Sequence, residues 1–420
     1  MIEKLTAVEF NEFSQNHEQS TFFQSSYWGE LKSFTGWVSH LVGLKIDGKI
    51  VAASLLLAKK IPVLNKYIYY APRGFLIDYE DNCLLEKFIL GIKKYVKKNK
   101  GIFIKINPYV EYQKHDIDGN IVGKPNQKVI NELESLGFKH NGFTITYGKD
   151  LEPRWLSVLD LKNKTEEDLL ADMRPTTRWS INNSYKHGLK LVEIDETRID
   201  EFKKLMEHTG ERRGFIDRPL SYYKKIMESF KDSVKVMLVE LDIEEYLINL
   251  KNQKQENMLK QAEIKGRNGN SKGERVLKEL KFQLEALNNK IELLTELEEE
   301  HGKILVIAGG LFMTFGKQVI SLFGASYKEY MKFNGQYFLN FKMILYALNH
   351  GYEKYNFYGI TGEFNEDSEM YGLFDFKRGF NSEVVELIGE FTMITNKPAN
   401  WLYEKMFQIY KKMKKKVKKW

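Results

Sequence analysis

The chain has few of the residues that would tie it to a disulfide framework or a metal centre. Of its 420 residues, only Cys83 is a cysteine. A single cysteine excludes an internal disulfide and suits a reducing cytosol. The eight histidines are scattered singly, and no two have the spacing of metal ligands. We therefore expect no disulfide and no metal site.

Several signatures of cofactors and compartments are also missing. No GxGxxG or GxxxxGK[ST] run occurs, which disfavours dinucleotide and P-loop chemistry. Nothing marks a serine or cysteine nucleophile. Residues 1–4 do not begin an apolar signal region, and the longest uncharged stretch, 304–316, is too short to span a bilayer. We expect a cytoplasmic protein without a cofactor.

The net charge of +7 is located at the end of the chain. Seven lysines lie in 411–419, so the other residues are balanced in charge. Apolar residues in 396–420 recur every three or four positions, which predicts a basic amphipathic helix. Such helices lie on anionic membranes, so we expect peripheral contact with the inner membrane surface. A helix packed on the body with a lysine-rich end is the alternative.

Residues 242–302 predict a helical arm, because Gly and Pro are almost absent outside its middle. The apolar residues of its return limb alternate at steps of three and four, as in the seam of a coiled coil. These residues are Leu277, Leu280, Leu284, Leu287, Ile291 and Leu294. The outgoing limb is less regular. Seven Lys or Arg against three Glu between Lys260 and Lys281 give the tip a positive charge that suits RNA phosphates or, equally, solvent.

The arm interrupts one of two similar hairpins. Apolar runs at 234–240 and 303–311 predict the strands on either side of it. The first half predicts the same hairpin at 40–46 and 49–57, joined by a two-residue turn at 47–48. A strand, a long helix and another strand are predicted after each hairpin. We infer two copies of one α+β unit, with the arm in place of a turn.

This order of elements is that of the acetyltransferase-like (GNAT-like) fold. We predict an α+β chain with a first GNAT-like subdomain at 1–150 and a second at 151–241 and 303–395. The antiparallel coiled-coil arm occupies 242–302 and the basic helix 396–420. Two such subdomains leave a cleft between them, where a site is expected. The loop with which relatives of this fold bind coenzyme A is absent, so the acyl donor is expected to differ.

Five local motifs are distinctive. They are QSSYW at 24–28 with Lys32, PRGFLIDY at 72–79, RGF at 213–215 with DRP at 217–219 and Tyr222, YNFYG at 355–359, and FDFKRGF at 374–380. With these motifs the chain resembles, over nearly its whole length, the Fem family of aminoacyl-tRNA-dependent peptidoglycan aminoacyltransferases. The resemblance implies transfer of glycine, alanine or serine from aminoacyl-tRNA to the stem-peptide amine of lipid II or a UDP-linked muropeptide. The product would be an interpeptide bridge.

The resemblance also implies roles for single residues. Binding of the precursor's diphosphate falls on Lys32, Arg218 and Tyr222, and fixed cations suit that group. The family's Phe-Lys pair at the transfer step is here Phe376 and Lys377. The Phe carbonyl is implied to orient the attacking amine, and the Lys to meet the tRNA end or developing charge. Residue type alone is equally consistent with ordinary surface cations at Lys32, Arg218 and Lys377. It is also consistent with simple core packing at Phe376.

Three further positions bear on the substrate. Tyr358 ends a predicted strand at the edge of the cleft. Some relatives carry an Asp where this chain has Asn107, and an amide cannot act as a general base. Relatives often carry a Tyr where this chain has Phe323, so a hydroxyl is lost. We expect substrate choice to differ accordingly.

Other functions fit the same sequence. The chain can be read as a family member whose altered bridge gives immunity or resistance to a lytic enzyme. It can also be read as a small-molecule N-acyltransferase that uses an acyl thioester. A third alternative is a non-enzymatic tRNA or membrane adaptor built on the coiled coil. The oligomeric state is not legible from the sequence.

Overall fold

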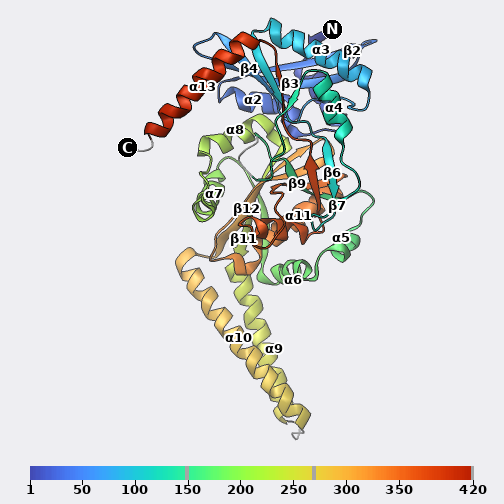
Figure 1. Cartoon of the computed structure of the whole chain (residues 1–420). Coiled ribbons are helices and arrows are strands. Elements are labelled where there is room, and N and C mark those ends of the chain that lie inside the picture. Colours follow the sequence, from blue (N-terminus) through green and yellow to red (C-terminus); the bar gives the residue numbers. More distant parts are fainter. Residues whose placement is uncertain (147–150, 267–270, 418–420) are drawn as a thin grey trace.

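The computed structural model describes residues 1–146, 151–266 and 271–417 of the chain. Two halves, each built on a β-sheet, lie one above the other in Figure 1. A helical arm projects from the second half, and a C-terminal helix lies against the first. The structure therefore has the α+β composition that the sequence predicts.

The first half contains a seven-stranded sheet in the order β1-β2-β3-β4-β5-β16-β8. Strands β4 and β5 run parallel, and the other neighbours are antiparallel. The strands are β1 (Ile2–Lys4), β2 (Trp37–Ile46), β3 (Lys49–Ile61), β4 (Lys66–Ala71), β5 (Gly101–Ile106), β16 (Phe391–Ile394) and β8 (Lys139–His140).

The second half contains a nine-stranded sheet in the order β10-β11-β12-β13-β14-β9-β15-β6-β7. Here β13 and β14 are the parallel pair. The strands are β10 (Leu189–Ile194), β11 (Val234–Asp242), β12 (Ile304–Phe315), β13 (Gln318–Ser326), β14 (Lys354–Ile360), β9 (Trp155–Asp160), β15 (Glu383–Leu387), β6 (Glu111–His115) and β7 (Ile121–Val122).

The two sheets repeat one topology. β1 to β5 and β10 to β14 share the same neighbours and directions, including the parallel last pair. The predicted pair of GNAT-like subdomains is confirmed. The halves also exchange strands: β16, from the end of the chain, pairs with β5, while β6 pairs with β15. Strands β6 and β7 precede residue 150 but belong to the second sheet, and β16 follows residue 150 but belongs to the first. The domain boundary at residue 150 stays a prediction.

Helices cover the sheets and join the halves. Phe22, Trp28 and Leu55 of the first half share one buried cluster with Phe230 and Leu311 of the second. The helices of the body are α1 (Ala7–Asn16), α2 (Ser26–Ser33), α3 (Asn82–Lys98), α4 (Gln127–Ser135), α5 (Glu166–Asp172), α6 (Pro175–Ser184), α7 (Ile199–Arg213), α8 (Leu220–Phe230), α11 (Gly335–Asn349) and α12 (Tyr371–Arg378). This shared cluster fixes the seam in which the site lies.

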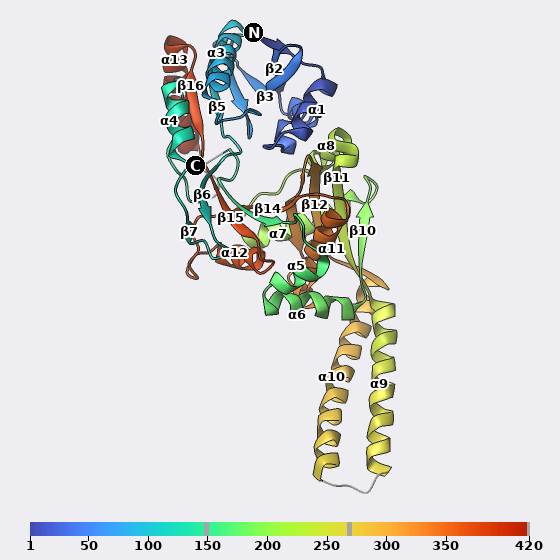
Figure 2. The same cartoon turned by 90° about the vertical axis from the view of Figure 1, so that its right-hand side faces the viewer.

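The arm consists of α9 (Ile243–Gly266) and α10 (Ser271–His301), which run antiparallel between β11 and β12 (Figure 2). Leu250 and Leu294 anchor its root in the core of the second half. Farther out, Asn257 and Gln261 are buried against α10, and the Asn257 amide donates to Gln283. These polar residues lie between the two helices of the arm, which explains why the outgoing limb lacks a regular apolar pattern.

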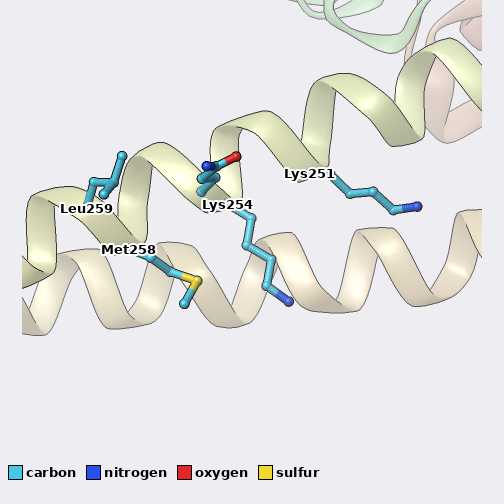
Figure 3. Close-up of a pocket in the computed structure, with 5 residues that line it drawn as sticks. Lys251, Lys254, Met258 and Leu259 are labelled. Atoms are coloured by element: carbon cyan, nitrogen blue, oxygen red, sulfur yellow. The ribbon is translucent and has the colours of Figure 1, made fainter.

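A shallow hollow lies beside α9 in the arm (Figure 3). It is lined by Lys251, Lys254, Gln255, Met258 and Leu259. These side chains come from one helix and include no carboxylate. We do not place the chemistry there.

The C-terminal helix α13 (Lys397–Val417) leaves the first sheet after two turns. Ala399 and Tyr403 pack against β5, whereas Leu402 and Ile409 are exposed. Within the described residues, no helix combines the length and the apolar character needed to cross a bilayer.

The root of the arm gives a test of this packing. Leu294 is 1% exposed, so Leu294→Ala should lower the free energy of unfolding by about 2–5 kcal/mol. Leu259→Ala, 59% exposed on the same arm, should change it by less than about 0.5 kcal/mol. Urea unfolding followed by circular dichroism measures both. Equal effects would contradict the burial of the root.

Candidate active site

Lys32 lies in the last turn of α2, facing the seam between the halves. The Ser25 hydroxyl caps this helix by accepting from the Trp28 amide at 3.1 Å. Trp28 is buried, and the Lys32 Nζ lies 4.3 Å from the centroid of its ring. The half-buried ammonium is therefore held in place by a fixed aromatic ring.

Arg218 reaches the same seam from the second half, in the turn before α8. Its neighbour Asp217 is anchored by Lys203 at 2.6 Å and by the Tyr223 hydroxyl at 2.5 Å. The guanidinium carbon of Arg218 lies 5.5 Å from the ring centroid of Tyr222. The turn is thus rigid, while Arg218 itself is exposed and forms no ion pair with any described residue.

Lys32 and Arg218 are close enough to affect each other. Burial lowers the pKa of Lys32, and the charge of Arg218 lowers it further, whereas Glu152 raises it. Desolvation and a like charge both disfavour the charged ammonium, so an anionic ligand between the two cations would relieve this cost. The structure therefore brings together Lys32, Arg218 and Tyr222 in an arrangement that suits an anion.

Glu152 is a member of this site that the sequence did not single out. It lies half-buried just before β9 and accepts a hydrogen bond of 2.7 Å from the Tyr358 hydroxyl. Burial raises the pKa of its carboxyl, while Arg73, Tyr358, Lys32 and Arg218 oppose that rise. Glu152 belongs to none of the sequence motifs, so its position near Lys32 and Arg218 is evident only from the folded structure.

Tyr358 points into the seam because β14 bulges at this residue. Its φ is +65°, a left-handed conformation that is rare for an aromatic residue. The register with β9 shifts between Asn356 and Tyr358, and the Asn356 side chain accepts from the Tyr358 amide at 2.8 Å. The phenol then stacks on Phe23, with ring centroids 6.3 Å apart.

Phe376 and Lys377 lie on the other face of β14. Tyr358, Tyr222 and Phe323 belong to the hydrophobic cluster at the seam, whereas Phe376 packs in the cluster on the α11 side. The structure therefore does not bring the Phe-Lys pair into contact with Lys32 or Arg218.

Lys377 is 7% exposed. Its Nζ donates to the carbonyl oxygens of Phe357 and Gly359, at 2.7 Å each. Burial lowers its pKa to about 7. Because the two acceptors flank Tyr358, the Lys377 amine holds the bulge that aims the phenol.

Asn107 and Phe323 border the same seam. The Asn107 side-chain oxygen accepts from the Tyr70 hydroxyl at 3.1 Å and from the Arg73 amide at 2.8 Å. Its buried Nδ2 has no hydrogen-bond partner among the described residues. Phe323 packs edge-on against Tyr223, with centroids 5.8 Å apart. Asn107 thus supports the loop that carries Arg73.

Known proteins match this chain over nearly all its length. It is 36% identical to the aminoacyltransferase FemA of Staphylococcus epidermidis over 419 residues, covering 98% of each chain. FemA of Staphylococcus aureus is 36% identical over 412 residues, 96% of this chain and 98% of that one. The crystal structure of FemX superposes with a TM-score of 0.80 at 28% identity, covering 96% and 99% of the chains.

These likenesses and the paired GNAT-like halves define an aminoacyltransferase. The sequence model of the FemAB family matches residues 5–408. The chain belongs to the FemAB family, and the resemblance read from its motifs is confirmed.

The low pKa of Lys377 predicts how stability changes with pH. Its folded pKa, about 7, lies below an unfolded value of about 10.4. The cost of burying the ammonium is therefore fully present below about pH 7, and it is relieved as pH rises toward about 10.

Lys377→Met removes this titration. The unfolding free energy of the wild type relative to Lys377→Met should increase between about pH 7 and pH 10. Urea unfolding at several pH values measures the difference, with exposed Lys49→Met as the control. A pH-independent difference would show that Lys377 is buried without a lowered pKa.

Proposed function

We propose that the enzyme transfers an amino acid, with glycine, alanine or serine expected, from aminoacyl-tRNA to the stem-peptide amine of a peptidoglycan precursor. The acceptor is lipid II or its UDP-linked form, and the product is an interpeptide bridge. The observation that carries this proposal is the convergence of Lys32 and Arg218, one from each half, neither of which has a carboxylate of the described residues within ion-pair distance.

A diphosphate fits these two cations. Arg218 offers a planar fork to its oxygens and Lys32 a partly desolvated point charge. The Tyr222 hydroxyl stays protonated, because burial raises its pKa to about 12, so it can donate to a third oxygen. Both forms of the precursor contain such a group. The seam is therefore the proposed precursor site.

The reaction itself needs positioning more than an added activating group. The attacking amine forms a bond to the ester carbon, the ester C–O bond breaks, and the amine proton ends on the departing tRNA hydroxyl. An aminoacyl ester is already activated, so alignment and stabilisation of the oxyanion suffice. We assign the alignment to the Phe376 carbonyl, and we assign to Lys377, whose amine binds the carbonyls of Phe357 and Gly359, the support of β14 behind the transfer point.

We propose a cytoplasmic location with α13 resting on the inner membrane surface. Its exposed apolar residues and the lysines at 411–419 suit an anionic bilayer. A lipid-linked acceptor would be found at the same surface.

One transfer assay separates the candidate functions. Purified protein is incubated with radiolabelled aminoacyl-tRNAs and either lipid II or UDP-linked muropeptide, and label on the peptide is measured. Label that moves only from an acyl thioester would indicate the small-molecule N-acyltransferase. Absence of transfer from every donor would indicate the adaptor.

The diphosphate contacts give a mutational test. Lys32→Ala and Arg218→Ala should each weaken binding of UDP-linked muropeptide by about tenfold or more, because each removes a charge-assisted hydrogen bond. Binding of tRNA should change less, and exposed Lys49→Ala is the control. Calorimetric titration measures both ligands. Equal losses for the two would contradict the assignment.

The tail gives a second test. Removing 411–420 deletes seven lysines, each worth roughly 1 kcal/mol at an anionic surface. Flotation with anionic liposomes should fall at low salt, and the difference should disappear at high salt or with neutral liposomes. Unchanged flotation would exclude a membrane role for the tail.

A further inference from the structure

The outer face of α6 carries an exposed aromatic and polar stripe. Thr176, Trp179 and Asn182 point outward at three-residue spacing, and Lys186 follows in the short helix η2 (Tyr185–His187). Trp179 is 64% exposed. Figure 2 shows α6 on the outside of the second half, beside α5 and above the root of the arm. Nothing among the described residues covers this stripe.

The inner side of α6 is firmly attached, so the stripe is held rigid. Ile181 is fully buried. Arg174 binds Asp375 of α12 through both terminal nitrogens, at 3.0 and 2.9 Å. Arg178 donates to the last carbonyls of α5, at 2.8 Å for Ala171. Both arginines form their hydrogen bonds within the fold, whereas Trp179 and Lys186 face solvent and can contact a partner.

Unpaired cations lie near η2, at the end of the stripe. Lys186, Lys290 and Lys342 form no ion pair with any described residue. Lys342 lies over the ring of Tyr185, 4.8 Å from its centroid, and Tyr185 is itself 45% exposed. Exposed rings beside free ammonium groups are the chemistry that stacks bases and contacts phosphates in single-stranded nucleic acid.

The stripe starts next to the transfer residues. Arg174, at the beginning of α6, contacts Asp375, the residue before Phe376. The precursor cations Lys32 and Arg218 occupy the opposite face of β14. A nucleic acid docked at α6 would leave the cations on that opposite face free for the precursor.

We propose that the outer face of α6 and η2, with Lys342, binds the acceptor end of the donor tRNA. Bases of its single-stranded terminus stack on Trp179, and Lys186 and Lys342 contact its phosphates. This inference rests on the proposed function, because it names the docking surface of the same donor.

The test uses an uncharged, fluorescein-labelled RNA hairpin that ends in single-stranded CCA. Fluorescence anisotropy should show hairpin binding weakened at least about fivefold by Trp179→Ala, as for the loss of one stacked base. Trp179→Phe retains a π-face and should keep most of the affinity. The logarithm of the association constant falls with the logarithm of the salt concentration, and Lys186→Glu should make this slope shallower by about 0.7 or more.

Matched controls lie elsewhere on the surface. Trp401, on α13, is 59% exposed, and Lys49 is exposed on the first hairpin; Trp401→Ala and Lys49→Glu should leave hairpin binding unchanged. Thermal melting and binding of UDP-linked muropeptide confirm that each variant folds. The inference would be overturned if Trp179→Ala and Lys186→Glu bound the RNA hairpin as tightly as the control variants do. It would also be overturned if these two variants lost self-association but kept their RNA binding.

The transfer assay separates this inference from the proposed function. If the wild type transfers an amino acid and the α6 variants bind RNA normally, the docking surface is wrong and the function stands. If the wild type transfers nothing but binds the hairpin through Trp179, the function is wrong and the RNA surface stands.

Discussion

The site depends on one buried contact, the bonds of the Lys377 amine to the carbonyls of Phe357 and Gly359. These bonds fix a bulge in β14 and leave Tyr358 in a left-handed conformation. The phenol can then reach Glu152 across the seam. A neutral amine has two N–H groups and meets two acceptors here, so the contact needs no counter-ion. The two faces of β14 are thereby coupled through one residue.

Glu152 gives the proposed precursor site an unusual charge balance. The carboxylate lies within the electrostatic reach of Arg73, Lys32 and Arg218, and it partly neutralises them before any ligand is present. A bound diphosphate would place further negative charge beside it and favour its protonated form. Asn107 adds no charge of its own and serves the Arg73 loop instead.

Much of the fold was readable from the sequence, because local patterns encode it. The repeated hairpin, the inserted arm and the paired α+β units follow from apolar periodicity and turn residues. The proximity of Lys32 and Arg218 required the family resemblance. Glu152 and the bulge at Tyr358 arise only from contacts between distant segments, which no local pattern records. The buried Asn257 and Gln261 likewise account for the irregular apolar pattern of the outgoing limb.

The exchange of β16 and β6 between the sheets has a mechanical consequence. A hinge rotation of one half against the other would have to bend several chain crossings between the sheets at once, as well as open the aromatic cluster at the seam. The halves therefore behave as a single rigid frame. Any gating at the proposed site must then come from loops and side chains.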